Sequence, residues 1–466
     1  MPPTSASPTY SEIKIYTRSS QGRFARLRWL MVWLTQLVFY ATPWLLWNGR
    51  QAVLFDLDAR RFYLFNLVLY PQDFIYLALL LIICALGLFF VTTLAGRIWC
   101  GFACPQTVYT KLFMWLEQQF EGDRSARMRL DAAPWSIAKL ARKTGTQASW
   151  MVLSLWTGLT FVAYYTPART LALEAAQGAW GPWETFWVFF YGLATYGNAG
   201  YLREQVCKHM CPYARFQSAM FDQDTLIIGY DVRRGEPRGS RARAAQANGQ
   251  GDCINCTMCV QVCPTGIDIR DGLQSNCIGC AACIDACDDV MDKIGTPRGL
   301  VRYATQNAMA SGRQRLHWKQ HVLRPRVLVY GGLLLTLGAG LVGGLALHNP
   351  LRLNVIRDRG VLARIVDQGA VENVYRLQLM HALEHPQRYH ISVSSPDVSG
   401  LVAIGTVEPE LASTEERSVP IAVRLPAAQA EALAGQGITI QFHVQPADGA
   451  PDVEPVTESS RFLVPR

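Results

Sequence analysis

The fold of this chain is decided by the stretch Cys253-Ile-Asn-Cys256-Thr-Met-Cys259-Val-Gln-Val-Cys263-Pro264 and by a second stretch, Cys277-Ile-Gly-Cys280-Ala-Ala-Cys283-Ile-Asp-Ala-Cys287. Both read C-x2-C-x2-C-x3-C, which is the spacing that holds two 4Fe–4S clusters in one small bacterial-type domain. In this arrangement three cysteines of one run hold one side of a cluster, and the fourth ligand comes from the other run.

The spacing assigns each cysteine to a cluster. We expect one cluster on Cys253, Cys256, Cys259 and Cys287, and the other on Cys277, Cys280, Cys283 and Cys263. A disulfide framework would need an oxidising compartment, and zinc sites would use two pairs of cysteines rather than three plus one. The cysteines therefore predict a ferredoxin domain with two [4Fe–4S] clusters, an electron-transport role and a reducing compartment.

Composition indicates that much of the chain lies in a membrane. Of its 466 residues, 50% are hydrophobic, only 17% are charged and 13 are tryptophan. The formal net charge of +8 fits basic loops on the cytoplasmic side of a membrane. No run of Lys and Arg is interleaved with aromatic residues, so a nucleic-acid-binding groove is not expected.

Five apolar segments approach the ~20 residues that a helix needs to cross a bilayer. They run from about Arg28 to Trp47, Asp73 to Leu94, Trp150 to Pro167, Trp180 to Leu202 and Val327 to Leu347. Glycines in the fifth form a small-xxx-small pair that would seat another helix, although a loosely packed span explains them equally well. We therefore expect a polytopic α-helical membrane protein.

Basic residues predict the orientation of these spans. Lys and Arg are frequent before the first span and after the second and fourth, and they are fewer after the first and third. The positive-inside rule then places the N-terminus and the ferredoxin domain in the cytoplasm and the C-terminus in the periplasm of a bacterial inner membrane. The first 26 residues lack the apolar stretch of a cleaved signal peptide, so the first span is expected to remain as an anchor.

Residues beyond about Asn349 contain neither cysteine nor tryptophan. Alternating runs recur there at Val374–Leu379, Tyr389–Val393, Leu401–Val407, Val419–Leu425 and Ile438–Val444. Turn-prone residues separate these runs, which is typical of an antiparallel β-sandwich of about seven strands. The expected order is a cytoplasmic segment at 1–26, a membrane domain with four spans at 27–212, a cytoplasmic segment at 213–326 with the ferredoxin domain at about 245–300, a fifth span at 327–348 and the sandwich at 349–466.

Four further cysteines form two copies of a C-x3-C-P motif. Trp99-Cys100-Gly-Phe-Ala-Cys104-Pro105 follows the second span, and Cys207-Lys-His-Met-Cys211-Pro212 follows the fourth. The spacing i, i+4 places both sulfurs of a pair on one face of a helix. Each motif adjoins the cytoplasmic end of a span, so the two pairs are expected to meet if these spans are neighbours.

The residues alone leave the chemistry of this second site open. Four soft ligands would suit Cu(I), zinc or a further iron–sulfur cluster, with His209 and Met210 as additional ligands. A dithiol that cycles through a disulfide is another use, and inert thiols beside a helix-ending proline are the structural alternative. Two copies at equivalent places favour a site, whereas Cys84, alone within the second span, is expected to be a packing residue. No G-x-G-x-x-G follows a predicted strand, so electrons are expected from a separate donor.

Taken together, these motifs resemble the cytochrome c oxidase accessory proteins of the FixG/CcoG type. The resemblance rests on the C-x3-C-P pairs, the ferredoxin with its continuation Cys263-Pro-Thr-Gly-Ile-Asp-Ile-Arg270, and the sandwich tail, and it covers the chain from about Tyr16 onward. It implies an immunoglobulin-like tail, a role in assembling a cbb3-type oxidase and reduction of Cu(II) to Cu(I). It carries over the eight ferredoxin cysteines as cluster ligands and Cys100, Cys104, Cys207 and Cys211 as the copper or redox site.

The expected function is that of a membrane-bound oxidoreductase, a cupric reductase. Thiolate ligands favour Cu(I) over Cu(II), and iron–sulfur clusters reach potentials low enough to drive the electron transfer. The expected partners are a cytoplasmic electron donor, a copper chaperone or transporter, subunits or assembly factors of the oxidase, and a second copy of the chain. Two alternatives are a quinol-linked ferredoxin that feeds a respiratory reductase and a redox-sensing assembly scaffold.

Overall fold

The computed structural model describes residues 14–239, 249–312, 321–358, 363–366, 369–447 and 453–465. The chain forms two compact units: Met1–Leu45 with Leu77–Ala339, and Leu46–Tyr76 with Gly340–Arg466. Residues 1–13 of the expected N-terminal segment, and residues 245–248 at the expected start of the ferredoxin domain, lie outside the described residues.

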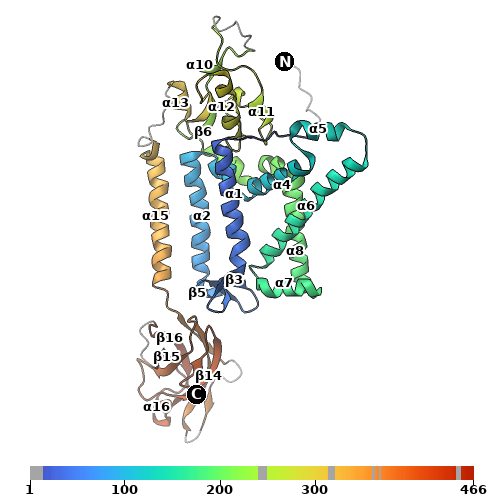
Figure 1. Ribbon diagram of the computed structural model, residues 1–466. Coiled ribbons are helices and arrows are strands. Elements are labelled where there is room, and N and C mark those ends of the chain that lie inside the picture. Colours follow the sequence, from blue (N-terminus) through green and yellow to red (C-terminus); the bar gives the residue numbers. More distant parts are fainter. Residues whose placement is uncertain are drawn as a thin grey trace, which may run out of the picture. The chain divides into compact units, whose positions relative to one another are not determined.

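The first unit consists of helices that lead into the ferredoxin domain (Figure 1). Its larger helices are α1 (Arg23–Ala41), α2 (Phe74–Ala95), α4 (Pro105–Glu121), α6 (Ile137–Val162) and α8 (Pro182–Thr195), with shorter helices α3 (Ile98–Phe102), α5 (Arg124–Ala132), α7 (Ala168–Gln177) and α9 (Pro212–Met220). Helices α6 and α8 pack closely because Gly158 has no side chain. A Cβ atom there would lie 2.2 Å from the carbonyl oxygen of Val188.

Two described helices are long and apolar enough to cross a membrane, at Pro71–Ala95 and Pro325–Ala346, the latter being α15. They coincide with the second and fifth predicted spans. The other three predicted spans overlap α1, α6 and α8, which do not meet this criterion of length and composition. The membrane character of the chain is therefore supported by two helices, and the number of five spans stays a prediction.

The helices that overlap the other predicted spans have different bounds for local reasons. Helix α1 ends at Ala41, and a strand forms at Leu46–Trp47, because Pro43 cannot continue the helix. Helix α6 begins at Ile137 rather than near Trp150, because the Ser136 hydroxyl accepts a 3.2 Å hydrogen bond from the Lys139 amide and caps the helix.

The ferredoxin domain is closed by two strands that flank its cysteine runs. Strands β6 (Ile227–Tyr230) and β7 (Val301–Ala304) pair antiparallel, with Ile227 opposite Ala304. Helices α11 (Met258–Gln261) and α12 (Ala282–Ile294) each start inside a cysteine run. The folded domain is therefore wider than the predicted 245–300.

Helix α12 also holds the start of α1. The buried carboxylate of Asp285 on α12 accepts hydrogen bonds from the backbone amides of Phe24 (3.0 Å) and Ala25 (2.6 Å). Acidic groups are favoured at this end of a helix, where amides lack partners and the dipole is positive. The ferredoxin domain is thereby joined directly to α1.

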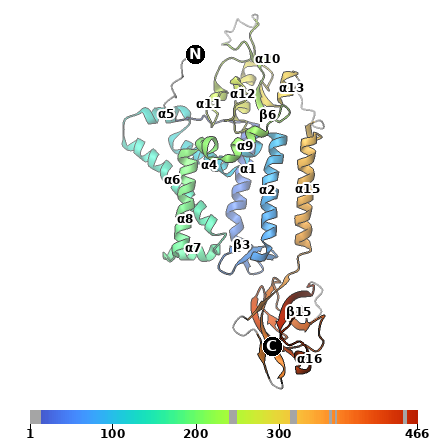
Figure 2. The ribbon, with the colours of Figure 1, turned by 180° about the vertical axis from the view of Figure 1, so that it is seen from behind.

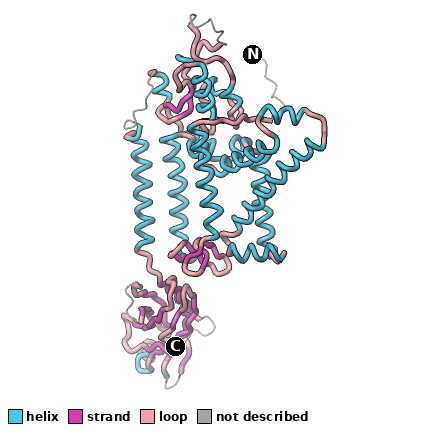
Figure 3. The backbone as a smooth tube through the Cα atoms, in the orientation of Figure 1, coloured by secondary structure: helices cyan, strands magenta, loops and turns pink. Residues whose placement is uncertain are grey.

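The second unit is an all-β sandwich, which appears as strands in Figure 3. One sheet has the order β12-β14-β10-β8 with β9 beside β10, and the other has β13-β11-β15-β16. The strands are β8 (Leu351–Arg357), β9 (Arg364–Ile365), β10 (Val371–His381), β11 (Gln387–Ser394), β12 (Val402–Gly405), β13 (Glu410–Leu411), β14 (Glu416–Leu425), β15 (Gly437–Pro446) and β16 (Val456–Leu463). The rings of Tyr375 and Phe442, both fully buried, meet edge to face at 5.1 Å between the sheets.

All five alternating runs predicted from the sequence are strands. Strands β8, β9, β13 and β16 were not predicted, and the described sandwich has nine strands instead of about seven. A small sheet of β3 (Val53–Asp56), β4 (Arg61–Leu64) and β5 (Leu67–Leu69) shares a hydrophobic cluster with Met380 and Ala382 of the same unit. Figure 2 shows the same elements from behind.

Candidate redox site

The eight cysteines of the ferredoxin domain line two cavities. Each cavity takes three cysteines from one run and one from the other. The first is lined by Cys253, Cys256, Cys259 and Cys287. The second is lined by Cys263, Cys277, Cys280 and Cys283, and Cys259 also reaches its wall. The structure thus brings together the two groups of four that the spacing predicts.

Both cysteine loops bend in the same way. The third and fifth positions of each run have left-handed backbone, with φ of 57° at Asn255, 57° at Thr257, 70° at Gly279 and 58° at Ala281. Alternation of left- and right-handed residues turns successive amide N–H groups toward one point, which forms a concavity that suits anions and iron–sulfur clusters. The equal geometry of the two loops fits two equal cofactors.

Burial makes these thiols poor acids in the absence of a metal. Burial above all, together with neighbouring cysteines, raises the pKa of Cys277 and Cys287 to about 12 and raises the pKa of Cys283 well above its ordinary value. Thiolate is the form that binds metal, and a coordinating metal ion removes the proton. These cavities would therefore hold thiolates stably only around a cationic centre.

The grouping of the cysteines favours a cluster over a single ion. Each cavity is lined by three cysteines of one run and one of the other, as in two-cluster ferredoxins. A zinc ion needs four ligands at about 2.0–2.3 Å, whereas a cubane binds each cysteine through a different iron. The residues of both cavities fit [4Fe–4S] clusters, and bound clusters would supply one-electron carriers there.

The C-x3-C-P motifs do not place both sulfurs on one helix, as the spacing predicted. Cys100 lies in α3 and Cys207 in a π-helical turn at Val206–Met210, but Cys104 and Cys211 precede the next helices, α4 and α9. In each motif the proline is the first residue of the following helix, where its missing N–H is harmless. The proline starts a helix, so the second cysteine of each pair sits at a helix N-terminus.

The two motifs are built alike and lie together. The amide of Cys104 bonds to the carbonyl of Trp99, and the amide of Cys211 bonds to that of Val206, five residues back in both cases and at 2.9 and 2.8 Å. Burial above all, and then the charges of its three companions, Cys104, Cys100 and Cys211, raise the pKa of Cys207 to about 12. The four cysteines therefore form one cluster of thiols.

His209 and Met210 differ from the four cysteines in exposure. Both side chains are exposed, with 60% of Met210 accessible, whereas the four cysteines are half-buried. The role of His209 and Met210 as additional ligands stays a prediction.

Helix α3 lies directly on the second cysteine loop of the ferredoxin domain. A Cβ atom on Gly101 would lie 2.6 Å from the carbonyl oxygen of Gly279 and 2.8 Å from the Cα of Cys280. Cys207 packs on the same loop, against a cluster that includes Ile278 and Cys280. The four-thiol site therefore adjoins one of the two cluster cavities with backbone in contact.

Arg97 ties these parts together. Its guanidinium donates hydrogen bonds to the backbone carbonyls of Cys277 (3.1 Å) and Ser275 in the second loop, and to the carbonyl of Ala214 (2.7 Å) and the hydroxyl of Ser218 (2.6 Å) on α9. Its positive charge is close enough to Cys100, Cys277, Cys207 and Cys211 to interact with all of them.

Arg97, Gly101 and Gly279 were not predicted from the sequence as parts of the site. The two glycines had a usable signal, because a glycine between ligand cysteines indicates close approach of backbone. Arg97 had no such local signal in the sequence, since its hydrogen-bond partners lie 117 to 180 residues further along the chain.

Comparisons with known proteins agree with this organisation. A family described as a 4Fe-4S dicluster domain matches residues 202–306, and one described as a 4Fe-4S binding domain matches 77–121. A third, described as the IG-like fold at the C-terminus of FixG, matches 341–465. The first two cover all twelve motif cysteines, and the third covers the sandwich.

Curated relatives match most of the chain. It is 40% identical over 420 residues to the "Nitrogen fixation protein FixG" of Rhizobium meliloti, covering 82% of this chain and 79% of the relative. It is 40% identical to "Protein RdxB" of Cereibacter sphaeroides, covering 84% and 85%, and 36% identical to "Protein RdxA" of the same organism, covering 94% and 91%. A crystal structure of a FixG-related protein from Vibrio parahaemolyticus matches 25% of this chain and 97% of its own, at 22% identity and a TM-score of 0.22.

The length and identity of these matches, the 4Fe-4S domains and the FixG-type tail identify the family. The protein is an iron–sulfur electron-transfer protein, and the chain belongs to the FixG family.

Proposed function

We propose that this chain carries single electrons from a cytoplasmic donor to Cu(II), and that the Cu(I) produced serves assembly of a cbb3-type cytochrome c oxidase. The observation that carries the proposal is the contact of α3 with the loop of Cys277–Cys283, which sets four thiols against one cluster cavity. In each transfer the donor loses one electron, and one Cu2+ ion gains it and becomes Cu+. Copper is the substrate in this scheme.

The two cavities have different surroundings, which gives the transfer a direction. Cys256 of the first cavity is exposed, so a soluble donor can approach that group. Cys280 of the second cavity is buried beneath α3 and packs with Cys207. Electrons would therefore enter at the first group of four cysteines and leave from the second.

The thiol site suits the acceptor. Thiolates are soft ligands that prefer Cu(I) to Cu(II), so copper bound by them is more easily reduced. At Cys104 the amides of Gln106 and Thr107, at the start of α4, hydrogen-bond to the thiolate and oppose the effect of burial on its pKa. The N-terminus of α4 thus favours the thiolate of Cys104, which is the form that binds copper.

Replacement of Cys207 and Cys211 by serine tests the proposal. The double variant should bind iron and sulfide like the wild type but should lose Cu(II) reduction, measured with a colorimetric Cu(I) chelator after anaerobic reduction of the protein. Cys84→Ser is the matched control, because Cys84 stands alone on α2. Full copper reduction by the double variant would refute the role of the four-thiol site.

A third [4Fe–4S] cluster is the second candidate occupant of the four thiols. It is favoured by the match of residues 77–121, which include Cys100 and Cys104, to a 4Fe-4S binding domain. Anaerobic protein without added copper would then contain about twelve irons, against about eight for two clusters. In that case copper would be reduced beside the third cluster rather than on the cysteines themselves.

We also propose that the ferredoxin domain faces the cytoplasm and the sandwich the periplasm, as the basic loops indicate. A fused reporter that needs an oxidising compartment should be active after residue 465 and inactive after residue 239. The reverse pattern would refute this orientation.

A further inference from the structure

The stretch Gly266-Ile-Asp-Ile-Arg270, which follows the last cysteine of the first run, has no role in the function proposed above. Cys263 belongs to the second cluster group, but this stretch reaches the first group. Ile269–Asp271 forms a 3₁₀ turn, and the side chain of Asp268 accepts a 3.0 Å hydrogen bond from the Arg270 amide at its start. Arg270 then lies in the wall of the first cavity, beside the cysteines Cys253, Cys256, Cys259 and Cys287.

The guanidinium of Arg270 is held on two sides. Its Nε and Nη2 donate to the carboxylate of Asp268 at 2.9 and 2.5 Å, and its Nη1 donates to the side-chain oxygen of Asn255 at 2.6 Å. Asn255 lies within the first cysteine run, between Cys253 and Cys256. The side chain of Arg270 is only 8% exposed. Because the guanidinium is planar and its donors are fixed, these bonds hold it in one orientation at the cysteine loop.

The charge of Arg270 acts on the cysteines more strongly than the charge of its partner does. The pKa of Cys259 is raised to about 11, above all by burial, and the charge of Arg270 acts to lower it, whereas the opposite effect of Asp268 is smaller. Apart from the cysteines, Arg270 is the single charged side chain in the described lining of the first cavity, and Asp268 does not belong to that lining. The ion pair therefore presents its cationic end to the sulfurs.

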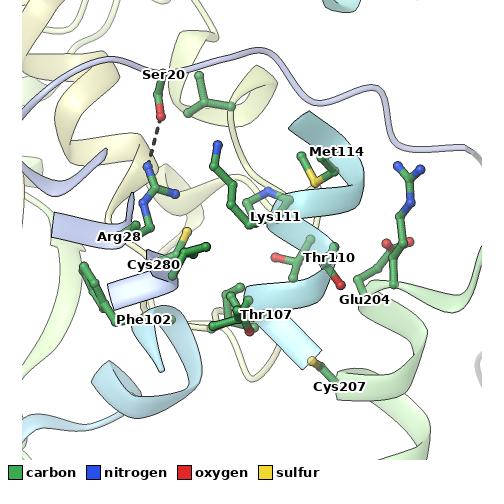
Figure 4. Close-up of a pocket in the computed structure, with 18 of the residues that line it drawn as sticks. Ser20, Arg28, Phe102, Thr107, Thr110, Lys111, Met114, Glu204, Cys207 and Cys280 are labelled. Carbon is green, nitrogen blue, oxygen red and sulfur yellow. Dashed lines mark hydrogen bonds between the residues drawn. The ribbon is translucent and has the colours of Figure 1, made fainter. Parts of the chain in front are cut away.

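The second cavity differs in this respect, since its described lining has no charged side chain apart from the cysteines. Basic residues lie near it but outside its wall. Figure 4 shows Arg28 and Lys111 around a neighbouring pocket that Cys280 also lines. Arg97 bonds to backbone carbonyls of the second loop, among them that of Cys277. Within the described residues, a guanidinium in the cavity wall is therefore special to the first cluster group.

We propose that Arg270, positioned by Asp268, raises the reduction potential of the first cluster. A [4Fe–4S] cluster on four thiolates is net negative, and reduction adds one more negative charge. A fixed cation with N–H donors beside the sulfurs stabilises the reduced state more than the oxidised state. In this step a cytoplasmic one-electron donor loses an electron and the first cluster gains it, and no bond forms or breaks. The inference goes beyond copper reduction and stands whichever acceptor takes the electron.

Arg270→Gln tests the proposal in a redox titration of the anaerobic full-length protein, followed by the paramagnetic resonance of its reduced clusters. One of the two cluster signals should move to a lower potential, and the other should stay at its wild-type value. A tenfold loss of preference for the reduced state corresponds to a shift of about 59 mV for one electron. Arg298→Gln is the matched control, because Arg298 forms the same kind of bidentate pair with Asp292, at 2.8 and 2.7 Å, but is 68% exposed.

A measurement on the wild type keeps the test decisive even if Arg270→Gln loses iron. In protein whose arginines carry a nitrogen isotope label, a reduced cluster should show magnetic coupling to an arginine nitrogen, and Arg270→Lys should remove that coupling. The proposal is overturned if Arg270→Gln leaves both potentials unchanged, if Arg298→Gln shifts them equally, or if the labelled wild type shows no arginine coupling. Copper enters none of these readouts, so their failure leaves the proposed copper reduction standing.

Discussion

At the scale of single residues, Arg97 is the main link between the ferredoxin domain and the C-x3-C-P site. Arg97 is only 8% exposed. Its guanidinium donates hydrogen bonds to the Cys277 carbonyl in the ferredoxin domain and to the Ala214 carbonyl on α9. Hydrogen bonds from a charged donor contribute about 1.5–3 kcal/mol each. Arg97→Met should therefore lower the thermal midpoint and slow electron transfer to copper in a single-turnover stopped-flow experiment, while Arg97→Lys should lose less.

The control for this variant is Arg298→Met. Arg298 is 68% exposed on the same domain and pairs with Asp292 at the surface, where ion pairs contribute little. Transfer to copper at the wild-type rate in Arg97→Met would show that Arg97 has no part in connecting the two sites.

The cysteine assignments could be predicted at this scale, because C-x2-C-x2-C-x3-C is a local pattern. The spacing gave the two groups of four that line the two cavities. Arg97 could not be found in this way. Its role depends on which distant segments fold around it, and an isolated Arg has no spacing to recognise.

At the scale of elements, α3 and the second cysteine loop touch through two glycines. In Gly101→Ala the new Cβ atom would meet backbone atoms of Gly279 and Cys280 at 2.6–2.8 Å, which cannot move aside as a flexible side chain can. Overpacking of this kind costs about 1–3 kcal/mol. We expect slower copper reduction and a lower thermal midpoint, measured on protein with its iron content determined.

Gly87→Ala is the matched control, because a Cβ atom at Gly87 of α2 would meet nothing within 4 Å. Equal copper reduction by Gly101→Ala and Gly87→Ala would contradict the close contact of α3 with the loop.

The helical character of the C-x3-C-P motifs could be predicted only in part. The spacing predicted both cysteines of a pair on one helix, and only the alternative of inert thiols had the proline end a helix. Pro105 and Pro212 each begin a helix instead. Both roles of proline follow from its missing N–H, and the sequence does not say on which side of it the helix lies. The alternating strands of the sandwich were easier to predict, because burial on one face imposes a period of two.

In the sandwich, His381 makes stability depend on pH. It is fully buried at the end of β10, and burial lowers its pKa below 6.5. Its Nε2 donates to the carbonyl of His385 at 2.8 Å, so Nδ1 is left to accept from the Tyr389 hydroxyl at 2.7 Å, which suits the neutral ring. His385 and Glu415 are the charged groups that also act on it, lowering and raising its pKa respectively.

The unfolded chain therefore binds a proton at this histidine before the folded sandwich does. The contribution of His381 to the free energy of unfolding is fully present above pH 6.5. It falls as the pH drops below 6.5, by at most about 1.4 kcal/mol per pH unit. Calorimetry of the full chain at pH 7.5 and 5.5 should show a lower sandwich transition at the acidic pH, and His381→Gln should reduce that difference. An equal difference in both proteins would refute the prediction.

At the scale of the whole molecule, the order of domains could be predicted and their edges could not. The ferredoxin domain needs β6 and β7 to close it, and these strands lie outside the cysteine runs. The weaker spans were uncertain for a related reason, since α1 and α6 carry polar residues on their buried faces. Helix α8 has only 14 residues, which is short for a membrane span. Length and hydropathy alone identified the two most apolar of the predicted spans.

The central claim is that the cysteine runs hold two iron–sulfur cubanes that feed the four-thiol site. Iron, acid-labile sulfide and zinc analysis of anaerobically purified protein, combined with paramagnetic resonance after reduction, tests it most directly. The account predicts about eight irons and eight sulfides per chain, or about twelve of each with a third cluster, and the resonance of reduced cubanes. Colourless protein that contains zinc in place of iron would contradict it.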